Sequence, residues 1–482
     1  MNEQAAVNLV EETFNQPYDE ARFRTFVRNV FRDFGEKDER ALSGTYIWDD
    51  YKEHVAQYKR IGSFIDAEEN QTDILAVKLK GNTKLERART TQRNFVAKYL
   101  DRGRGDIQRD AALVAFYSDD TPDWRFSLVR MEYSLDIETG ATTQELSPAR
   151  RYSFLVGAGE RTHTAQQQLL PLLRSDASLT LDGLERAFDI ESVTAEFFKR
   201  YKALFLELKE ELDDLLKGDV RAEFDTRDLT AATFAKRLMG QIVFLYFLQK
   251  KGWLGVKRGE AWGTGPKDFL RRLFREEYVP YTNFFDDLLE PLFYEALALE
   301  RSENFYSRFD CKIPFLNGGL FEPSGGYDWV NVAIPLKNET FGRIFDVFDL
   351  YNFTVREDEP LEKEVAVDPE MLGKVFENLL EVEDRKSKGA FYTPREIVHY
   401  MCQESLVSFL DTRLNPVRRP LRGTPATQDD LFGRPQATQA ALTEEVYEPR
   451  IPREDLETFI RLGDQAVEND TRIVSKGKET KD

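Results

Sequence analysis

Cysteine, histidine and long apolar runs are all scarce in this sequence of 482 residues. The two cysteines, Cys311 and Cys402, are far apart and lack the spacing of a metal site, which favours a reducing compartment. Only three histidines are present, so a histidine-based zinc site is not expected. No apolar run approaches the ~20 residues that span a bilayer, and the N-terminus carries acids where a signal peptide carries Lys or Arg. We therefore expect a cytoplasmic protein with no membrane partner.

A surplus of positive charge is lacking as well, because the formal net charge is −19. A protein that coats nucleic acid with its whole surface is basic, so binding to nucleic acid has to be argued from local patches. Residues 75–110 form one such patch, with ten Lys and Arg against four acids. A solvated helix face explains this charge as well as a nucleic-acid contact does. If the patch contacts phosphates, we expect Arg87, Arg89 and Arg93 to be the residues that bind DNA.

The apolar content that is present, 41% hydrophobic and 12% aromatic residues, supports a folded protein. The length favours roughly two to four domains. Residues 1–150 are predicted to be a mixed α/β domain. Its expected helices lie over 23–34 and 85–100, and its expected strands over 58–68, 72–80, 111–118 and 124–133.

The rest of the sequence favours helices. Residues 151–355 are predicted to be mostly helical, and Phe234 to Leu254 favours a buried central helix because it is apolar but charged at both ends. In residues 356–482 the expected elements are helices over 369–382 and 394–410, a Pro- and Gly-rich excursion near 413–450, and a last helix over 453–465.

Four segments of the sequence resemble one family of proteins. They are ERARTTQRNFVAKYL (Glu86 to Leu100), VFLYFLQKKGWL (Val243 to Leu254), PFLNGGLFE (Pro314 to Glu322), and Asp368 to Met401, which contains RKSKGAFYTPREIVHYM. Together they resemble the type IIG and related single-chain restriction–modification proteins, which carry a γ-class adenine-specific N6 DNA methyltransferase. The last segment is the most specific of the four.

The resemblance implies an α/β plus all-α architecture in three parts. A PD-(D/E)xK-like nuclease domain would occupy 1–150, a helical connector 151–355, and the start of a Rossmann-like methyltransferase domain 356–482. It also implies S-adenosylmethionine as cofactor, double-stranded DNA as partner, and a role in restriction–modification and phage defence.

The GAFYTP motif is the candidate cofactor site. In the family this segment forms one wall of the S-adenosylmethionine pocket, which implies that Ala390, Phe391, Tyr392, Thr393 and Pro394 contact the cofactor. The residue types fit, because a small residue admits a ligand close to the backbone and a helix N-terminus attracts an anion such as the methionine carboxylate. An ordinary helix start, with Thr393 as N-cap, explains the same residues locally.

The family's later motifs are not found in this sequence. No acidic-x-Gly-x-Gly loop follows Met401, and the sequence contains no Pro-Pro pair. The family's Asn/Asp-Pro-Pro-Tyr/Phe motif binds the flipped adenine, so its absence predicts that this chain alone does not methylate DNA. An earlier Gly-x-Gly, Gly157 and Gly159, has no third glycine and is predicted to lie in a loop.

A nuclease site is a further hypothesis for the first domain. The predicted strand Thr72 to Lys80 resembles the core strand of PD-(D/E)xK nucleases, in which carboxylates hold Mg²⁺ and a lysine assists the attacking water. The candidates are Asp73, as metal ligand and catalytic carboxylate, and Lys80. Position 78 departs from the pattern, because Lys78 stands where a metal-binding glutamate is expected. A degenerate nuclease fold that only binds DNA or braces the methyltransferase is the alternative.

Three functions therefore stay open at this point. The favoured one is the N-terminal part of a site-specific adenine N6 DNA methyltransferase with a fused nuclease-like module. The alternatives are a non-catalytic DNA-binding or scaffold subunit of a defence system, and a stand-alone Mg²⁺-dependent nuclease.

Overall fold

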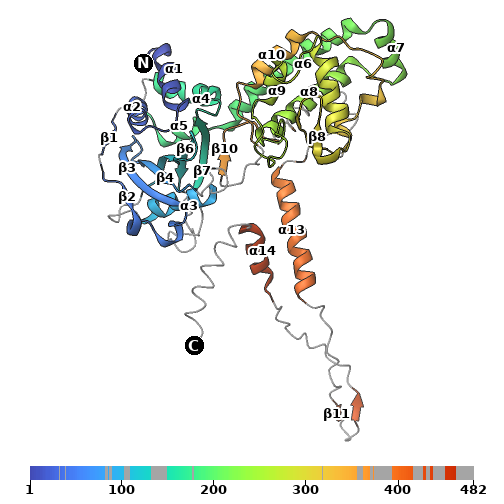
Figure 1. Cartoon of the computed structure of the whole chain (residues 1–482). Coiled ribbons are helices and arrows are strands. Elements are labelled where there is room, and N and C mark those ends of the chain that lie inside the picture. Colours follow the sequence, from blue (N-terminus) through green and yellow to red (C-terminus); the bar gives the residue numbers. More distant parts are fainter. Residues whose placement is uncertain are drawn as a thin grey trace. The chain divides into compact units, whose positions relative to one another are not determined.

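The computed structural model describes residues 1–31, 33–37, 39–81, 85, 89–102, 109–131, 149–175, 178–316, 318–354, 362–369, 373, 393, 395–415, 427–429, 435–437 and 451–462. The chain divides into two compact units, Met1–Glu381 and Val382–Asp482. The first unit contains a mixed β-sheet and a body of helices, which confirms the expected combination of α/β and helical parts (Figure 1).

An eight-stranded mixed sheet organises the N-terminal part of the first unit. Its strands lie in the order β1-β3-β4-β5-β6-β7-β10, and β2 pairs with β3. The pairs β4–β5 and β7–β10 are parallel, and the other pairs are antiparallel. The strands are β1 (Gly35–Glu36), β2 (Leu42–Ser43), β3 (Val55–Ile65), β4 (Gln71–Leu79), β5 (Ala111–Tyr117), β6 (Asp123–Arg130), β7 (Arg150–Gly157) and β10 (Glu362–Glu364).

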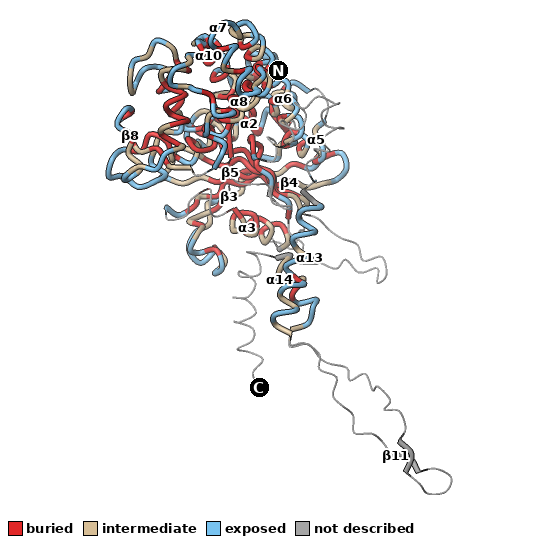
Figure 2. The backbone as a smooth tube through the Cα atoms, turned by 90° about the vertical axis from the view of Figure 1, so that its right-hand side faces the viewer, coloured by how far each residue is buried: buried red, intermediate tan, exposed pale blue. Residues whose placement is uncertain are grey.

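Helices cover both faces of this sheet (Figure 1). One face packs on α1 (Glu3–Phe14), α2 (Glu20–Val30), α4 (His163–Arg174) and α5 (Leu181–Arg186). The other face packs on α3 (Arg89–Arg102). Alternate residues of β4 serve the two cores, so Ile74 belongs to the first and Leu75 to the second. The central strands are therefore buried on both sides, as Figure 2 shows for β4 and β5.

Four strands and two helices of the sheet region were expected from the sequence, the helix predicted over 23–34 being α2, and the four strands β1, β2, β7 and β10 were not. The predicted strands appear as β3, β4, β5 and β6, and the predicted basic helix as α3. The strand β7 contains Gly157, which was predicted to lie in a loop, and extends past the predicted boundary at residue 150. The strand β10 comes from the predicted methyltransferase part and pairs with β7, with Glu364 opposite Ser153. The predicted domain boundaries therefore do not coincide with the edges of the sheet.

The helical body follows the sheet in sequence and lies within 190–353. Its main helices are α6 (Ile190–Leu215), α7 (Gly218–Thr226), α8 (Ala231–Lys250), α9 (Phe269–Phe274), the π-helices η3 (Phe285–Leu289) and η4 (Leu292–Leu297), and α10 (Asn338–Phe348). Short 3-10 segments complete the first unit: η1 (Gly44–Tyr46), η2 (Asp49–Tyr51), η5 (Ser302–Asn304), η6 (Gly319–Phe321) and η7 (Ser324–Gly326). A small hairpin, β8 (Phe305–Tyr306) and β9 (Cys311–Lys312), lies among them.

The helix α8 is the buried centre of this body, as its apolar sequence predicted. It begins at a capping box formed by Thr230 and Thr233, and thirteen of its twenty residues are buried. Its mixed apolar surface packs on α6 and α9, so no single stripe faces the core. No helix in the described part of the chain is long and apolar enough to cross a membrane.

The second unit contains α13 (Arg395–Leu414), α14 (Arg453–Leu462) and a short antiparallel pair, β11 (Thr427–Asp429) and β12 (Pro435–Ala437). The helices α13 and α14 match the helices predicted over 394–410 and 453–465. Asn415 ties their ends together, because its side chain accepts a hydrogen bond from the Ile451 N–H at 3.0 Å and donates one to the Ile451 carbonyl at 2.9 Å. The helix predicted over 369–382 lies almost wholly outside the described residues.

Candidate functional site

Asp73, the predicted metal ligand, is fully buried on the α3 face of the sheet. Its Oδ1 atom accepts a hydrogen bond from Arg60 of β3 at 2.7 Å. Its Oδ2 atom accepts one from the Tyr99 hydroxyl of α3 at 2.7 Å and lies 2.5 Å from Nε of Arg109. Burial lowers the pKa of Arg60, but the charge of Asp73 outweighs it and the pKa is raised overall. Both carboxylate oxygens are thus occupied by cations and a hydroxyl.

Lys80, the predicted catalytic partner of Asp73, lies at the opposite end of β4. It is exposed, and its backbone N–H donates to the His54 carbonyl just past the end of the strand. Seven residues of extended chain separate the two positions, or roughly 23 Å. Lys78, which departs from the nuclease pattern, pairs instead with Asp119 at 2.6 Å. The structure therefore does not bring Asp73 and Lys80 together, and their roles in a nuclease site stay a prediction.

The described residues around Asp73 do not form a binding site for a divalent cation. Two guanidinium groups beside Asp73 repel a cation electrostatically, and a metal-binding carboxylate needs free oxygen lone pairs. Within the residues that the structure describes, no group of three or more His, Cys, Asp or Glu could hold a metal ion. The structure gives no support to the predicted Mg²⁺ site at Asp73.

Arg89 and Arg93, two of the three predicted DNA-binding residues, are buried under the sheet rather than displayed on the surface. They are 8% and 0% exposed, and Arg87 lies outside the described residues. Arg89 forms an ion pair with Glu364 of β10. The predicted basic face of this helix is therefore turned inward in the structure, where a DNA phosphate does not reach it.

Polar groups from three strands explain why this arginine face is inside. Arg125 of β6 lies 3.2 Å from Glu364 and donates to the Ser153 hydroxyl of β7 at 3.1 Å. Arg151 of β7 donates to the side chain of Gln92 on α3 at 2.8 Å. Buried charges are tolerated when they are paired and hydrogen-bonded, so this network fixes α3 and β10 on the sheet. The network was invisible in the sequence because Glu364 follows the strands by about 200 residues.

Of the predicted cofactor segment 390–394, the structure describes Thr393. Thr393 is exposed and lies two residues before Arg395, the first residue of α13. Ala390, Phe391, Tyr392 and Pro394 lie outside the described residues, so their assignment to S-adenosylmethionine stays a prediction.

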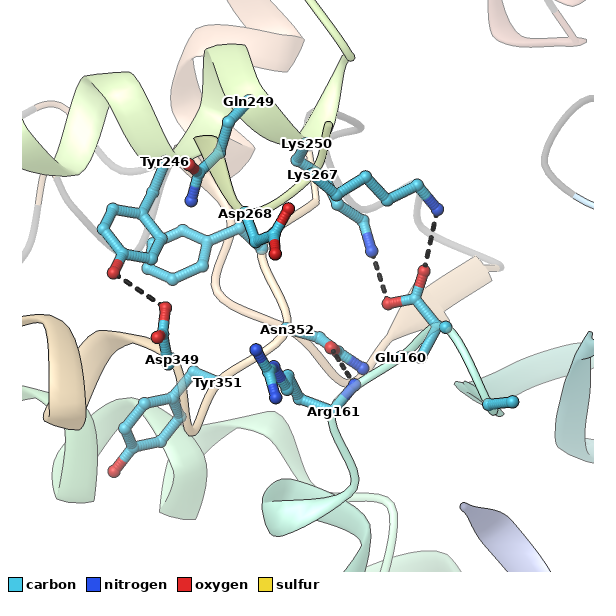
Figure 3. Close-up of a pocket in the computed structure, with 13 residues that line it drawn as sticks. Glu160, Arg161, Tyr246, Gln249, Lys250, Lys267, Asp268, Asp349, Tyr351 and Asn352 are labelled. Atoms are coloured by element: carbon cyan, nitrogen blue, oxygen red, sulfur yellow. Dashed lines mark hydrogen bonds and ion pairs between the residues drawn. The ribbon is translucent and has the colours of Figure 1, made fainter. Parts of the chain in front are cut away.

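A cavity of about 290 Å³ lies within the first unit, between the end of β7 and the helical body, and no motif in the sequence had indicated it (Figure 3). We call it the junction pocket. It is lined by residues 158–161 after β7, by the end of α8, by Lys267 and Asp268 before α9, and by residues 349–353 after α10. These segments are far apart in sequence, and polar side chains from all of them point into the cavity.

Glu160 is a buried carboxylate of the junction pocket and forms ion pairs with two lysines. Its carboxylate is 2% exposed and lies 2.5 Å from Nζ of Lys250 and 3.2 Å from Nζ of Lys267. Burial raises the pKa of Glu160, but the two ammonium groups outweigh it and the pKa is lowered. The nearby Asp123 has a raised pKa because it is half-buried and feels the charge of Glu160.

The opposite wall of the junction pocket is held by hydrogen bonds to Asp349 and Asn352. Asp349 accepts from the Tyr246 hydroxyl at 2.9 Å and from Arg271 at 2.8 Å. Asn352 accepts from the Arg161 backbone N–H at 3.0 Å and donates to the Leu155 carbonyl at 3.1 Å. The helical body is thus joined to the end of β7 through a preorganised polar cavity.

Comparison with known proteins gives one relative. Over 254 residues, which are 47% of this chain and 20% of the relative, the chain is 31% identical to "Putative type II restriction enzyme and methyltransferase RM.MjaORFECS2P" of Methanocaldococcus jannaschii. This chain therefore matches about a fifth of the length of that protein. No family model matches the sequence, and no solved structure matches it. The chain is similar to part of a protein named for restriction and methyl transfer.

Proposed function

We propose that this chain is the N-terminal part of a restriction–modification protein that acts on double-stranded DNA. The observation that carries the proposal is the 31% identity to a protein named as a type II restriction enzyme and methyltransferase. The GAFYTP segment, which resembles the start of a methyltransferase domain, supports the same proposal. The modification that we propose is transfer of a methyl group from S-adenosylmethionine to N6 of adenine.

Within this proposal the segment 390–394 contributes one wall of the cofactor pocket. Thr393 would offer its hydroxyl, and the start of α13 its free backbone N–H groups, to the methionine carboxylate. The exposed apolar side chains of α13 support its membership of a larger domain, since Ile397, Met401 and Phe409 are each more than half exposed. The catalytic Pro-Pro motif would then be supplied by polypeptide outside this sequence.

The N-terminal sheet in this proposal is a nuclease-like scaffold that does not cleave DNA. Asp73 is occupied by Arg60, Arg109 and Tyr99, and Lys80 is at the far end of its strand. The buried arginine network instead joins α3 and β10 to the sheet, which favours a bracing role. Purified chain with plasmid and Mg²⁺ should therefore leave the plasmid supercoiled, and Mg²⁺-dependent nicking that disappears in Asp73→Asn would contradict this role.

A methyl-transfer assay tests the main proposal. The chain alone should transfer no tritiated methyl group to plasmid DNA, whereas the chain produced together with the polypeptide encoded downstream of Asp482 should. Mass spectrometry of the digested DNA should find N6-methyladenine. In the active assembly, Thr393→Ala should raise the KM for S-adenosylmethionine about tenfold, and the control Thr412→Ala, also on α13, should not. Methylated cytosine, or transfer by the chain alone, would overturn the proposal as stated.

A further inference from the structure

The junction pocket brings together three cationic side chains from three segments of the chain. Arg161 comes from the linker after β7, Lys250 from the last turn of α8, and Lys267 from the segment before α9. Figure 3 shows the two lysines converging on Glu160 and the Arg161 guanidinium beside Asn352. The lysine side chains are 16% and 48% exposed, and Arg161 is an exposed residue, so solvent reaches all three.

The acids around the junction pocket leave a positive surplus in it. Glu160 is shared by the two lysines, which balances only one of them. Asp268 is paired with Arg272 at 2.7 Å, and Asp349 with Arg271 at 2.8 Å, and neither arginine lines the cavity. Arg271 also pairs with Asp346 at 2.9 Å, but Asp346 is 71% exposed and screened by water, so Arg271 acts mainly on the more buried Asp349.

Asp123, which accepts the Gly159 N–H at 2.8 Å, is the remaining acid nearby, and its raised pKa means that it ionises less readily. Among the described residues Arg161 has no carboxylate within ion-pair distance, so its charge is available to a ligand.

The backbone that carries Arg161 is held in one conformation. Gly157 has φ +134°, and a Cβ at this residue would come within 2.5 Å of Asp123 Cα, so only glycine fits the turn. Gly159 and Arg161 then donate their N–H groups to Asp123 and Asn352. A fixed backbone lowers the entropy that is lost when a side chain on it is ordered by a ligand.

We infer that the junction pocket binds a phosphate group through Arg161, Lys250 and Lys267. A guanidinium offers a planar pair of N–H donors that fits phosphate oxygens, and the two ammonium groups add point charges, each with donors to spare beside Glu160. The volume of about 290 Å³ accommodates a phosphate with part of its ester, rather than a whole drug-sized ligand. The source of the phosphate is the DNA backbone if the proposed function holds, and otherwise a free nucleotide.

The experiment compares Arg161→Gln and the double variant Arg161→Gln/Lys267→Gln with matched controls. The controls are Arg221→Gln and Lys209→Gln, which remove the same charges from exposed ion pairs elsewhere on the helical body. Lys250 is kept, because it is the closer and more buried of the two partners of Glu160, at 2.5 Å and 16% exposed against 3.2 Å and 48% for Lys267. Binding of a 20-base-pair duplex is measured by fluorescence anisotropy over a range of salt concentrations, and binding of inorganic pyrophosphate by calorimetry.

We expect the double variant to bind the duplex at least tenfold more weakly and to reduce the salt slope by about one, as expected for the loss of one phosphate contact. Pyrophosphate binding should be lost in the same variant and kept in both controls. If the full chain binds pyrophosphate through these residues but no DNA, the phosphate site stands with a nucleotide source and the proposed DNA function falls. Unchanged binding of both probes in the double variant, or no binding of either by the unaltered chain, would overturn the inference.

Discussion

Asp73 in the sheet and Glu290 in the helical body are both withdrawn from solvent, yet their neighbours are of opposite kinds. Asp73 lies against the guanidinium groups of Arg60 and Arg109, at 2.7 Å and 2.5 Å. Glu290, which is 1% exposed, accepts a hydrogen bond from the Tyr327 hydroxyl at 2.5 Å and has no ion pair among the described residues. Burial raises the pKa of Glu290 to about 9, so this carboxyl is neutral at pH 7.

The difference shows that burial alone does not decide the charge of an acid. In the sheet, Arg60 of β3 and Arg109 before β5 contact the Asp73 carboxylate and join elements that are distant in sequence. In the helical body, Tyr294 and Tyr327 supply dipoles but no charge, and desolvation prevails. The two sites should therefore respond in opposite ways to substitution.

Replacing Asp73 should have the largest effect. Asp73→Ala leaves Arg60 and Arg109 as buried charges without their carboxylate, which costs about 3–5 kcal/mol of unfolding free energy. Urea denaturation followed by circular dichroism measures this change. Because no metal is expected at Asp73, adding Mg²⁺ or EDTA should leave the midpoint of the unaltered chain unchanged. A loss below about 1 kcal/mol, or stabilisation by Mg²⁺, would show that Asp73 is held for another purpose.

Glu290→Gln should act in the opposite direction. The folded pKa of Glu290 lies above the unfolded value of 4.5, so the folded state keeps a proton that the unfolded state loses as pH rises. Stability contributed by this carboxyl is therefore full below about pH 4.5 and declines between pH 4.5 and 9. Glutamine preserves the neutral shape without this decline. The linkage makes the variant about 4–5 kcal/mol more stable than the unaltered chain at pH 8 and leaves the two within about 1 kcal/mol of each other at pH 5.

The two sites also show how far the sequence could predict the fold. The two strand-like segments 58–68 and 72–80, separated by a polar turn, predict the β3–β4 hairpin because both strands and the turn are adjacent in the sequence. The strands β7 and β10 are not indicated by such patterns, since Arg151, Ser153 and Glu364 have the polarity of surface residues. They are buried because Arg151 pairs with Gln92, and Arg125 with both Ser153 and Glu364. A local sequence pattern does not indicate partners that are about 200 residues away in the sequence.

The candidate sites could be predicted less well than the strands, because their residues also depend on partners that are distant in sequence. Asp73 and Lys80 fit a nuclease pattern in residue type, but seven residues of extended strand separate them. Arg89 and Arg93 have the residue type and spacing of a DNA-binding face. In the fold they are buried against the sheet, where Arg89 pairs with Glu364. The junction pocket had no sequence signal, because Glu160, Lys250 and Lys267 meet only when β7, α8 and the segment before α9 are folded together.

Glu160 tests whether lysine partners stabilise a buried carboxylate as much as the arginine partners of Asp73 do. Its folded pKa is depressed, so its stabilising contribution is present above the unfolded pKa of 4.5 and is lost as pH falls through the lower folded value. Glu160→Gln should cost about 1 kcal/mol at pH 7, less than the loss at Asp73, because Lys267 can turn toward solvent. In chemical denaturation the cost should decline as the pH falls below the unfolded pKa of 4.5. A cost that stays constant as the pH falls below 4.5 would assign the effect to packing instead of charge.

The smallest effect is expected at an ion pair outside both buried sites. Arg221 and Asp225 form an i,i+4 pair at 2.9 Å on α7, with side chains 59% and 63% exposed. Its geometry is as good as that at Asp73, so a count of ion pairs would give the two sites equal weight. Water screens the exposed charges and solvates either one when its partner is removed, and we expect Arg221→Gln to cost no more than about 0.5 kcal/mol. Thermal unfolding at low and high salt measures it, and the small loss should shrink further with added salt. A cost comparable to that of Asp73→Ala would mean that pairing itself, rather than burial without an alternative partner, sets the stability of the sheet site.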